Sequence, residues 1–184
     1  MGDLRAFVAV DIPDDLKEKI RKIQAEFNGF GLKMVDPKIV HLTLKFLGDV
    51  PKENIKKVSE ALNCVNCEPF TSELRGVGVF PNFKRIRVVW IGAIGDFELL
   101  HDSVESLLEP LGFAREDKRF TSHITVARAK KITKDEERLV AGKVKDLTGI
   151  TLGSMPVDRI KLKKSTLTPK GPIYEDLYVK ELGG

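Results

Sequence analysis

Alternating apolar and polar residues mark most of the predicted strands in this chain. Such alternation is typical of a strand that buries one face, and turn-forming residues bound the segments that show it. Hairpin signals, such as "PKGP" near the C-terminus, outnumber the helices that could connect parallel strands. The pattern therefore favours a mainly antiparallel sheet. We predict strands over residues 5–13, 32–35, 41–48, 70–80, 85–92, 119–129, 158–168 and 174–182.

Apolar residues spaced three and four apart predict four helices between these strands. The first begins near Asp14, ends at Gly29, and has an apolar face made of Leu16, Ile20, Ile23 and Phe27. The others are expected over residues 52–63, 96–109 and 133–146. No Gly/Ser/Pro-rich linker separates the two halves, each of which holds two helices and several strands. We predict an α+β fold in one bilobal domain over residues 1–184, with two similar, interleaved lobes of mainly antiparallel sheet, helices outside, and a pseudo-two-fold axis at a central groove.

Composition adds a few limits to this picture. Apolar residues make up 42% of the chain, and 31 basic against 27 acidic residues give a formal charge of +4. That mild excess is compatible with an RNA or nucleotide partner but does not identify one. The chain has no run of eighteen apolar residues and no N-terminal signal segment, so we expect a soluble, cytoplasmic protein without a membrane partner. Gln24 is the one glutamine among many Lys, Arg and Glu residues, which predicts a thermophilic source.

One short motif occurs twice, once in each half of the chain. His41-Leu42-Thr43-Leu44 and His123-Ile124-Thr125-Val126 both read His-x-Thr-x with aliphatic residues at x. On a strand, residues two apart point to the same face, about 7 Å from each other. Each motif therefore offers one apolar face for the core and one face that carries an imidazole and a hydroxyl.

A single His-x-Thr strand would more often be a row of polar cross-strand contacts or a core histidine than a site. Two copies in matching halves change that balance, because only three histidines exist in the chain and two of them occupy equivalent positions. If the lobes are related by a two-fold axis, the polar faces meet at a shared site. The third, His101, lies in a predicted helix without a matching partner, so a structural role is expected for it.

Two imidazoles that face one phosphate can act as base and acid without a cofactor, since both titrate near neutral pH. One removes a proton from an attacking water while the other protonates the departing oxygen. The hydroxyls of Thr43 and Thr125 could hold phosphate oxygens, and a cation could offset the charge. Arg128, at the end of the second motif strand, is the candidate cation. By alternation Lys45 is expected on the same face as His41, as a residue at the rim of the site.

Other chemistries fit these residues less well. A zinc site would need a third His, Cys or carboxylate at ligand spacing, which the motifs lack, so no metal is expected. Ser122 precedes His123 without a nucleophile elbow and should face away from the site. Cys64 and Cys67 form one CxxC with no second ligand pair, and we interpret them as ordinary thiols at the end of a helix.

The paired motifs and their flanking text resemble the 2H phosphoesterases, a family named for two His-x-Thr-x motifs. The branch called RNA 2′,3′-cyclic phosphodiesterase or 2′-5′ RNA ligase is the closer match. The resemblance runs nearly end to end, through "RAFVAVDIP", "HLTLKFLGDVP", "GVGVFPNFKRIRVVWIG", "SHITVAR" and "LKKSTLTPKGPIYEDL". It implies a bilobal α+β fold with a central groove. It also implies hydrolysis of RNA 2′,3′-cyclic phosphate ends to 2′-phosphomonoesters without metal or cofactor, and reversible 2′-5′ joining of tRNA halves.

The resemblance also assigns roles to the motif residues. It implies that His41 is the proton donor and His123 the proton acceptor, and that Thr43, Thr125 and Arg128 bind phosphate oxygens. Near symmetry leaves the acid and base labels exchangeable. Relatives often have proline directly before the second histidine, where this chain has Ser122. We expect this departure to affect the local backbone and not the chemistry.

Two alternatives remain open from the sequence. A nucleotide- or RNA-binding module could keep the groove without turnover, although both motifs retain every histidine and threonine. The resemblance also allows an enzyme of the same kind that acts on small cyclic nucleotides or on ADP-ribose cyclic phosphate, as other branches of the superfamily do. The expected partners are therefore RNA ends with a 2′,3′-cyclic phosphate, tRNA halves among them, or nucleotides. Nothing in the sequence requires a dimer, so we expect a monomer.

Overall fold

The computed structural model describes residues 2–184 and contains one sheet and four α-helices. The strands are β1 (Leu4–Asp11), β2 (Leu32–Met34), β3 (His41–Val50), β4 (Phe70–Asn82), β5 (Arg85–Ile94), β6 (His123–Ala129), β7 (Thr151–Val157), β8 (Arg159–Thr168) and β9 (Gly171–Glu181). The helices are α1 (Asp14–Ala25), α2 (Ile55–Asn63), α3 (Phe97–Leu108) and α4 (Lys134–Asp146). Short 3₁₀ turns occur at η1 (Pro37–Ile39), η2 (Lys52–Asn54) and η3 (Glu109–Leu111).

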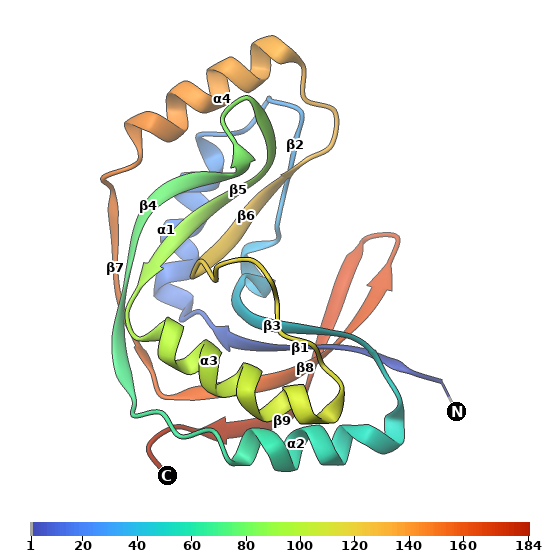
Figure 1. Cartoon of the computed structure of the whole chain (residues 1–184). Coiled ribbons are helices and arrows are strands. Elements are labelled where there is room, and N and C mark those ends of the chain that lie inside the picture. The colour runs from blue at the N-terminus through green and yellow to red at the C-terminus, as the bar shows by residue number, and fades with distance from the viewer. Residues whose placement is uncertain (1) are drawn as a thin grey trace.

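The sheet is antiparallel throughout and has the strand order β7-β4-β5-β6-β3-β1-β8-β9, with β2 paired to β6. Figure 1 shows that β4, β5 and β6 run steeply while β1, β3 and β8 run across the view, so the sheet curls strongly between β6 and β3. The hairpin of β8 and β9 projects from one side. The two strands that carry the His-x-Thr-x motifs, β3 and β6, are the central neighbours of this sheet. The predicted α+β class with a mainly antiparallel sheet is confirmed.

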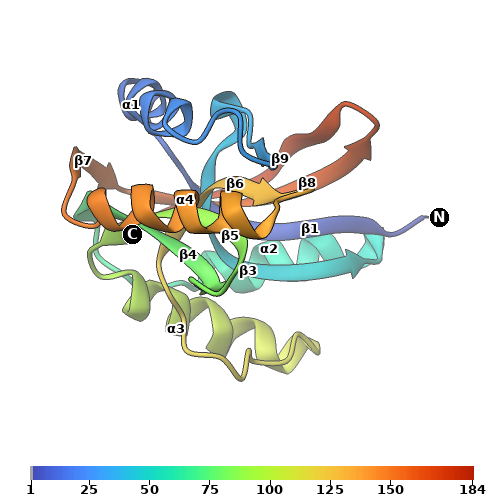
Figure 2. The same ribbon diagram turned by 90° about the horizontal axis from the view of Figure 1, so that it is seen from above.

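The helices cover the two halves of the sheet in an interleaved way. α1 and α4 pack on the half that contains β4, β6 and β7, whereas α3 packs on β3, and α2 packs on α3 and β9. In Figure 2, α1 and α3 lie on opposite sides of the strands. The chain therefore crosses between the two halves of the sheet several times. The longest of the four helices has 13 residues, and none within residues 2–184 is long and apolar enough to cross a membrane.

Burial explains why these segments form helices and strands. The apolar face predicted for the first helix is buried, with Leu16, Ile20, Ile23 and Phe27 each at most 6% exposed. α4 starts with a capping box, in which the Thr133 hydroxyl accepts from the Glu136 N–H and the Glu136 carboxylate accepts from the Thr133 N–H. This arrangement satisfies two helix N–H groups that would otherwise lack partners.

Two features of the sheet differ from the sequence prediction. The strand β7 was missed, because Gly153 and Pro156 disfavour strands; as an edge strand it tolerates proline, which would interrupt a central one. The strand predicted from Arg119 begins instead at His123. Residues 119–122 belong to the connection that precedes β6.

Candidate active site

The two motif strands meet at the centre of the sheet. β3 and β6 run antiparallel and are joined through the pair Leu42 and Ile124, whose side chains are both fully buried. In an antiparallel pair, the residue before Leu42 lies across from the residue after Ile124, and the reverse also holds. The aliphatic residues of the motifs therefore anchor the two strands from the core side.

This register brings the four predicted motif residues together on the opposite face. His41 lies across from Thr125, and Thr43 lies across from His123. All four side chains are partly exposed. We call this side of the sheet, defined by these four residues, the motif face. Its pseudo-two-fold arrangement gives each histidine a threonine from the other strand as its neighbour.

A bulge lies at the fourth residue of each motif. In β3 Leu44 has no partner in β1, as Leu47 further along also has none, and in β6 Val126 has no partner in β5. A bulge inserts one residue and so reverses the alternation of side chains beyond it. As a result, the fifth residue after each histidine returns to the motif face. These residues are Phe46 in β3 and Arg128 in β6.

The prediction that Lys45 shares the face of His41 is wrong for this reason. Beyond the bulge Lys45 points to the core side, where its side chain is 2% exposed. Its Nζ lies 2.7 Å from Glu105 Oε1 of α3 and donates to the carbonyl oxygen of Ala114 at 2.8 Å. Lys45 is a buried ion-pair partner and not a cation at the rim of the site.

Arg128, in contrast, lies on the motif face beyond the bulge. Its charge contributes to a lowered pKa at His41 and at His123. The side chain itself is exposed. Strand alternation alone would have placed Arg128, five residues after His123, on the core side, so the bulge is what brings this cation to the motif face.

The two imidazoles are held in the same tautomer. His41 Nδ1 lies 2.9 Å from the carbonyl oxygen of Ile39, and His123 Nδ1 lies 2.6 Å from that of Thr121. Because a carbonyl oxygen can only accept, each Nδ1 carries a hydrogen and donates it. Nε2 of each ring is then the atom left for substrate, as an acceptor when the ring is neutral and as a donor when it is protonated.

Aromatic rings surround His41 on the motif face. Its ring centroid lies 4.9 Å from that of Phe7 and 5.2 Å from that of Tyr174, which meets it edge-on. The ring centroid of Phe7 also lies 6.2 Å from that of Phe46, whose side chain is 62% exposed. The prediction from sequence missed these three aromatic residues, because plain alternation hides Phe46 and no motif marks the other two. The signal that was available is the equal spacing of Phe46 and Arg128 from the motif histidines.

His123 has its own aromatic neighbours. Phe80 meets its ring edge-on at 4.9 Å, and Trp90, the one tryptophan of the chain, lies 6.2 Å away. Gly78 in β4 leaves the space that the indole occupies, since a Cβ at this position would lie 2.2 Å from a Trp90 ring atom. The ring contacts restrict His123, so that its Nε2 keeps a defined direction.

Burial lowers the pKa of both catalytic candidates. At His41, desolvation is the largest cause; the Lys163 and Arg128 charges add to it, while the Ile39 hydrogen bond and the Asp11 carboxylate oppose it. At His123, desolvation again dominates, with Arg128 adding to it and the Thr121 hydrogen bond opposing it. Without substrate, both imidazoles are therefore more readily neutral than an ordinary histidine.

A network of two lysines and two aspartates borders His41. Lys161 Nζ lies 2.7 Å from Asp11 and 2.6 Å from Asp176, and Lys163 Nζ lies 2.9 and 2.7 Å from the same two carboxylates. Burial opposes ionisation of the aspartates, but the hydrogen bonds from both lysines outweigh it and lower the pKa of Asp11 and of Asp176. Asp11 pairs with His41 across β1 and β3, so this network fixes charges beside that histidine.

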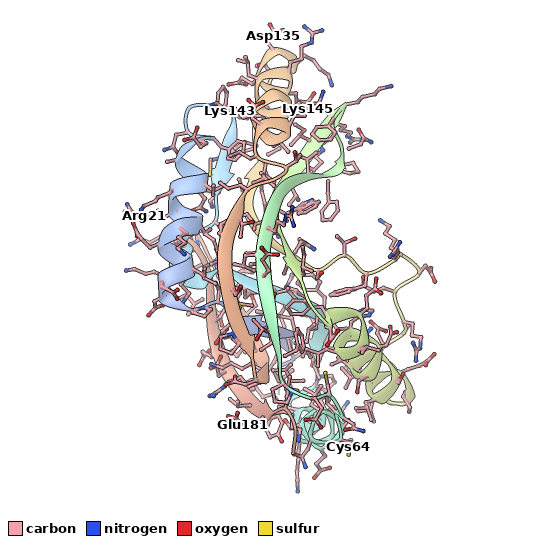
Figure 3. The ribbon with its side chains drawn as sticks, turned by 90° about the vertical axis from the view of Figure 1, so that its left-hand side faces the viewer. Arg21, Cys64, Asp135, Lys143, Lys145 and Glu181 are labelled. Atoms are coloured by element: carbon pink, nitrogen blue, oxygen red, sulfur yellow. The ribbon has the colours of Figure 1, made fainter. Side chains whose placement is uncertain are left out.

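The remaining sequence candidates lie outside this arrangement. Ser122 Oγ donates to the carbonyl oxygen of Ala93 at 2.6 Å, which ties the residue before His123 to β5. Cys64 follows the last residue of α2 (Figure 3), and it and Cys67 are free thiols. His101 is buried in α3. Among residues 2–184, no three histidine, cysteine, aspartate or glutamate side chains lie together in a way that could hold a metal ion.

Relatives of this chain in several organisms carry the same name. The chain is 45% identical over 181 residues to the RNA 2′,3′-cyclic phosphodiesterase of Archaeoglobus fulgidus, an alignment that covers 97% of this chain and 100% of the relative. It is 37% identical to the protein of that name from Methanocaldococcus jannaschii, with 94% and 97% covered. The thermophilic source expected from composition fits the organisms of many of these relatives.

Solved structures agree with the fold. E. coli LigT complexed with 3′-AMP superimposes with a TM-score of 0.81 at 26% identity, with 99% of each chain covered. TT0787 of Thermus thermophilus gives a TM-score of 0.79 at 31% identity, with 98% of this chain and 99% of the other covered. The family profile described as LigT like Phosphoesterase matches residues 10–90 and 94–174, and each stretch contains one His-x-Thr-x motif. With both motifs on one face and this match over most of its length, the chain belongs to the LigT-like phosphoesterase family.

Proposed function

We propose that this protein hydrolyses the 2′,3′-cyclic phosphate at an RNA end to a 2′-phosphomonoester. The observation that carries the proposal is the matched pair His41 and His123, each with Nδ1 bonded to a backbone carbonyl and Nε2 left for substrate on the motif face. The name of the relatives, RNA 2′,3′-cyclic phosphodiesterase, supports the choice of substrate. Acid and base are both side chains, so the reaction requires no cofactor.

In the proposed reaction His123 acts as base and His41 as acid. Nε2 of His123 accepts a proton from water, and the water oxygen attacks phosphorus. The bond from phosphorus to the ribose 3′ oxygen breaks, and protonated His41 donates its Nε2 proton to that oxygen. The products are a 2′-phosphomonoester and a free 3′-hydroxyl. His41 ends neutral and His123 charged, and proton exchange with solvent restores both.

The surroundings of the two histidines support this assignment. The Asp11 carboxylate favours the protonated form of His41, as a proton donor requires, and opposes the lowering of its pKa by burial. Thr43 and Thr125 each lie across from the histidine of the other strand, where their hydroxyls can donate to non-bridging phosphate oxygens. The Arg128 guanidinium supplies the positive charge that stabilises the phosphorane-like transition state.

The same chemistry run with another nucleophile would join RNA ends. If a ribose 5′-hydroxyl replaces water, attack on phosphorus forms a 2′-5′ phosphodiester and releases the 3′-hydroxyl, with the same proton transfers. We include this joining of tRNA halves in the proposal as a side activity. Incubation of a cyclic-phosphate end with an equimolar 5′-hydroxyl oligonucleotide tests it, and a product of summed length is expected only in the presence of active enzyme.

We further propose that the protein works as a monomer in the cytoplasm. One chain supplies both motifs, so the site needs no second copy. Cys64 and Cys67 are free thiols, which is typical of a reducing compartment. Light scattering after size exclusion should give the mass of one 20.6 kDa chain.

The deciding assay is incubation with an oligoribonucleotide that ends in a 2′,3′-cyclic phosphate, with excess EDTA. Conversion to a 2′-phosphate end is expected. A protein that binds this RNA without converting it would be the binding module instead. Faster turnover of cyclic mononucleotides or ADP-ribose cyclic phosphate than of the oligonucleotide would indicate a small-molecule enzyme.

A further inference from the structure

We propose that Lys45 and Glu105 form a positioning unit that fixes the strand of His41 relative to the segment that leads into His123. The inference rests on the function proposed above, because it concerns how two histidines reach one phosphate. Lys45 lies four residues after His41 in β3, and Glu105 lies in α3, which packs on β3. Both are on the core side of the sheet, so neither contacts substrate.

The pair is closely bonded and deeply buried. Lys45 Nζ and Glu105 Oε1 are 2.7 Å apart, and both side chains are 2% exposed. Taking two charges out of water costs more than burying two apolar side chains of similar size, so such a pair is a poor source of stability. Glu105 Oε2 adds to this cost, since it is buried and has no hydrogen-bond partner among residues 2–184. A role in geometry accounts for the pair better than a role in stability.

Lys45 also holds the loop that precedes β6. Its Nζ donates to the carbonyl oxygen of Ala114, in the connection 112–122 between η3 and His123. Residues 114–119 of this connection are exposed, and a cavity of about 420 Å³ lies between the connection and α3. Phe113 and Phe120 pack on the core at the two ends of this exposed stretch. Within the stretch, Arg115 and Arg119 bond to α3 and η3 through exposed side chains, whereas the bond from Lys45 comes from a buried side chain.

A second contact completes the connection to His123. The His101 ring stacks on Phe120 with centroids 4.2 Å apart and planes 14° apart, and His101 Nε2 lies 3.4 Å from Glu105 Oε1. Phe120 is three residues before His123. A continuous chain of contacts thus runs from Lys45 through Glu105 and His101 to Phe120. It joins the two motif strands from behind the sheet, in addition to the pair that joins them within it.

The test is the double substitution Lys45→Met/Glu105→Leu, which removes both charges and keeps the volume. We expect a melting temperature equal to or above that of the parent, because the unpaired oxygen and the desolvated charges are gone. Turnover of an oligoribonucleotide cyclic phosphate should fall about 10- to 100-fold in kcat, since a misplacement of about 1 Å between reacting groups costs on the order of 100-fold. KM should stay within about threefold, because the groups that bind phosphate are unchanged. Amide hydrogen exchange over residues 112–122 should become faster.

The control is Glu18→Leu/Arg21→Met in α1, which likewise replaces one acidic and one basic residue by leucine and methionine, but in an exposed ion pair (Figure 3 shows Arg21 pointing outward). It should leave kcat and the exchange of residues 112–122 at parental values. Parental kcat and parental exchange in Lys45→Met/Glu105→Leu would overturn the proposal. If that variant fails to fold, Glu105→Gln decides, since its amide oxygen still accepts from Lys45 and the same changes are expected at smaller size. If the parent itself shows no turnover, the proposed function fails, and the exchange rates alone decide the positioning role.

Discussion

Phe46 and Arg128 are equivalent residues in the two halves of the sheet: each lies five positions after a motif histidine and two beyond a bulge residue. One half thus places an aromatic ring on the motif face where the other places a guanidinium. The histidines and threonines are arranged with near symmetry, but these two residues are not. We infer that a phosphate anion is drawn toward the Arg128 side, and that this difference gives the substrate one preferred orientation.

Removing either imidazole should abolish most of the hydrolysis while leaving the fold intact. We expect His41→Ala and His123→Ala each to lower kcat about 10²- to 10⁴-fold, the range that a general acid or base contributes. Both side chains are only partly buried, so the melting temperature should change little. Quenching of Trp90, which lies 6.2 Å from His123, can check that a 2′-nucleotide still binds. A variant with parental turnover would contradict the two-histidine mechanism.

The dependence of kcat/KM on pH should be bell-shaped and centred on the acid side of the ordinary histidine value. The base must be neutral, so the rate falls as pH drops through the pKa of His123. The acid must be protonated, so the rate falls as pH rises through the pKa of His41. Burial lowers the pKa of both imidazoles below that of an ordinary histidine, so both limbs move toward acid. An optimum of kcat/KM on the alkaline side of neutrality would contradict the assignment.

Substitution of Arg128 should change both the rate and the pH profile. We expect Arg128→Gln to lower kcat/KM about 10- to 100-fold, as for the loss of a hydrogen bond to a charged group. Because the guanidinium lowers the pKa of both histidines, its removal should shift both limbs of the profile to higher pH. A loss of rate without any shift would mean that Arg128 binds substrate but lies too far from the imidazoles to act on them.

Gly78 should be required for the position of the indole beside His123. We expect Gly78→Ala to destabilise the fold by about 1–3 kcal/mol, the usual cost of overpacking, because the new methyl group overlaps the Trp90 ring. The emission of Trp90 and the turnover should change together. Gly142→Ala is the control: this glycine lies inside α4 with no atom near its missing Cβ, so alanine should stabilise the helix by up to about 1 kcal/mol.

Thermal unfolding offers a test of the source that composition predicts. We expect a melting temperature above about 65 °C, the upper end of the range for mesophilic domains. The network of Asp11, Asp176, Lys161 and Lys163 should contribute, since ion-pair networks gain importance at high temperature. Calorimetry at neutral pH measures it directly. A melting temperature in the mesophilic range would remove the inference from glutamine content.

The position of the motif residues on one face could be predicted from the sequence more completely than the backbone around them. His-x-Thr-x on a strand needs only the two-residue period of a sheet, so the motif face could be predicted from His41 and His123 alone. Leu42 and Ile124 are fully buried, as the same period requires. The edge strand β7 could not be predicted, because Pro156 disfavours a strand. Proline is tolerated at this position only because β7 lies at the edge of the sheet, which the sequence does not reveal.

The bulges at Leu44 and Val126 could not be predicted from the sequence. Nothing in the apolar pattern shows that Leu44 and Lys45 are both buried, because a bulge depends on pairing with a neighbouring strand. Strict alternation from His41 places Lys45 on the motif face and Phe46 on the core side, the reverse of what the structure shows. The charge of Arg128 and its place at the strand end predict a role at the site, but only the bulge at Val126 shows why its side chain lies on the motif face.

The bonds from Nδ1 of His41 and His123 to the carbonyls of Ile39 and Thr121 have a consequence for evolution. In many enzymes the partner of a catalytic histidine is a carboxylate side chain, which one point mutation can delete. Here it is a peptide group, and every amino acid brings the same one. Replacing Ile39 or Thr121 changes the side chain but leaves the acceptor in place. Substitutions at positions 39 and 121 therefore keep the hydrogen on Nδ1 of both rings. The residues that lead into each motif strand can vary during evolution without a change in the tautomer of either histidine.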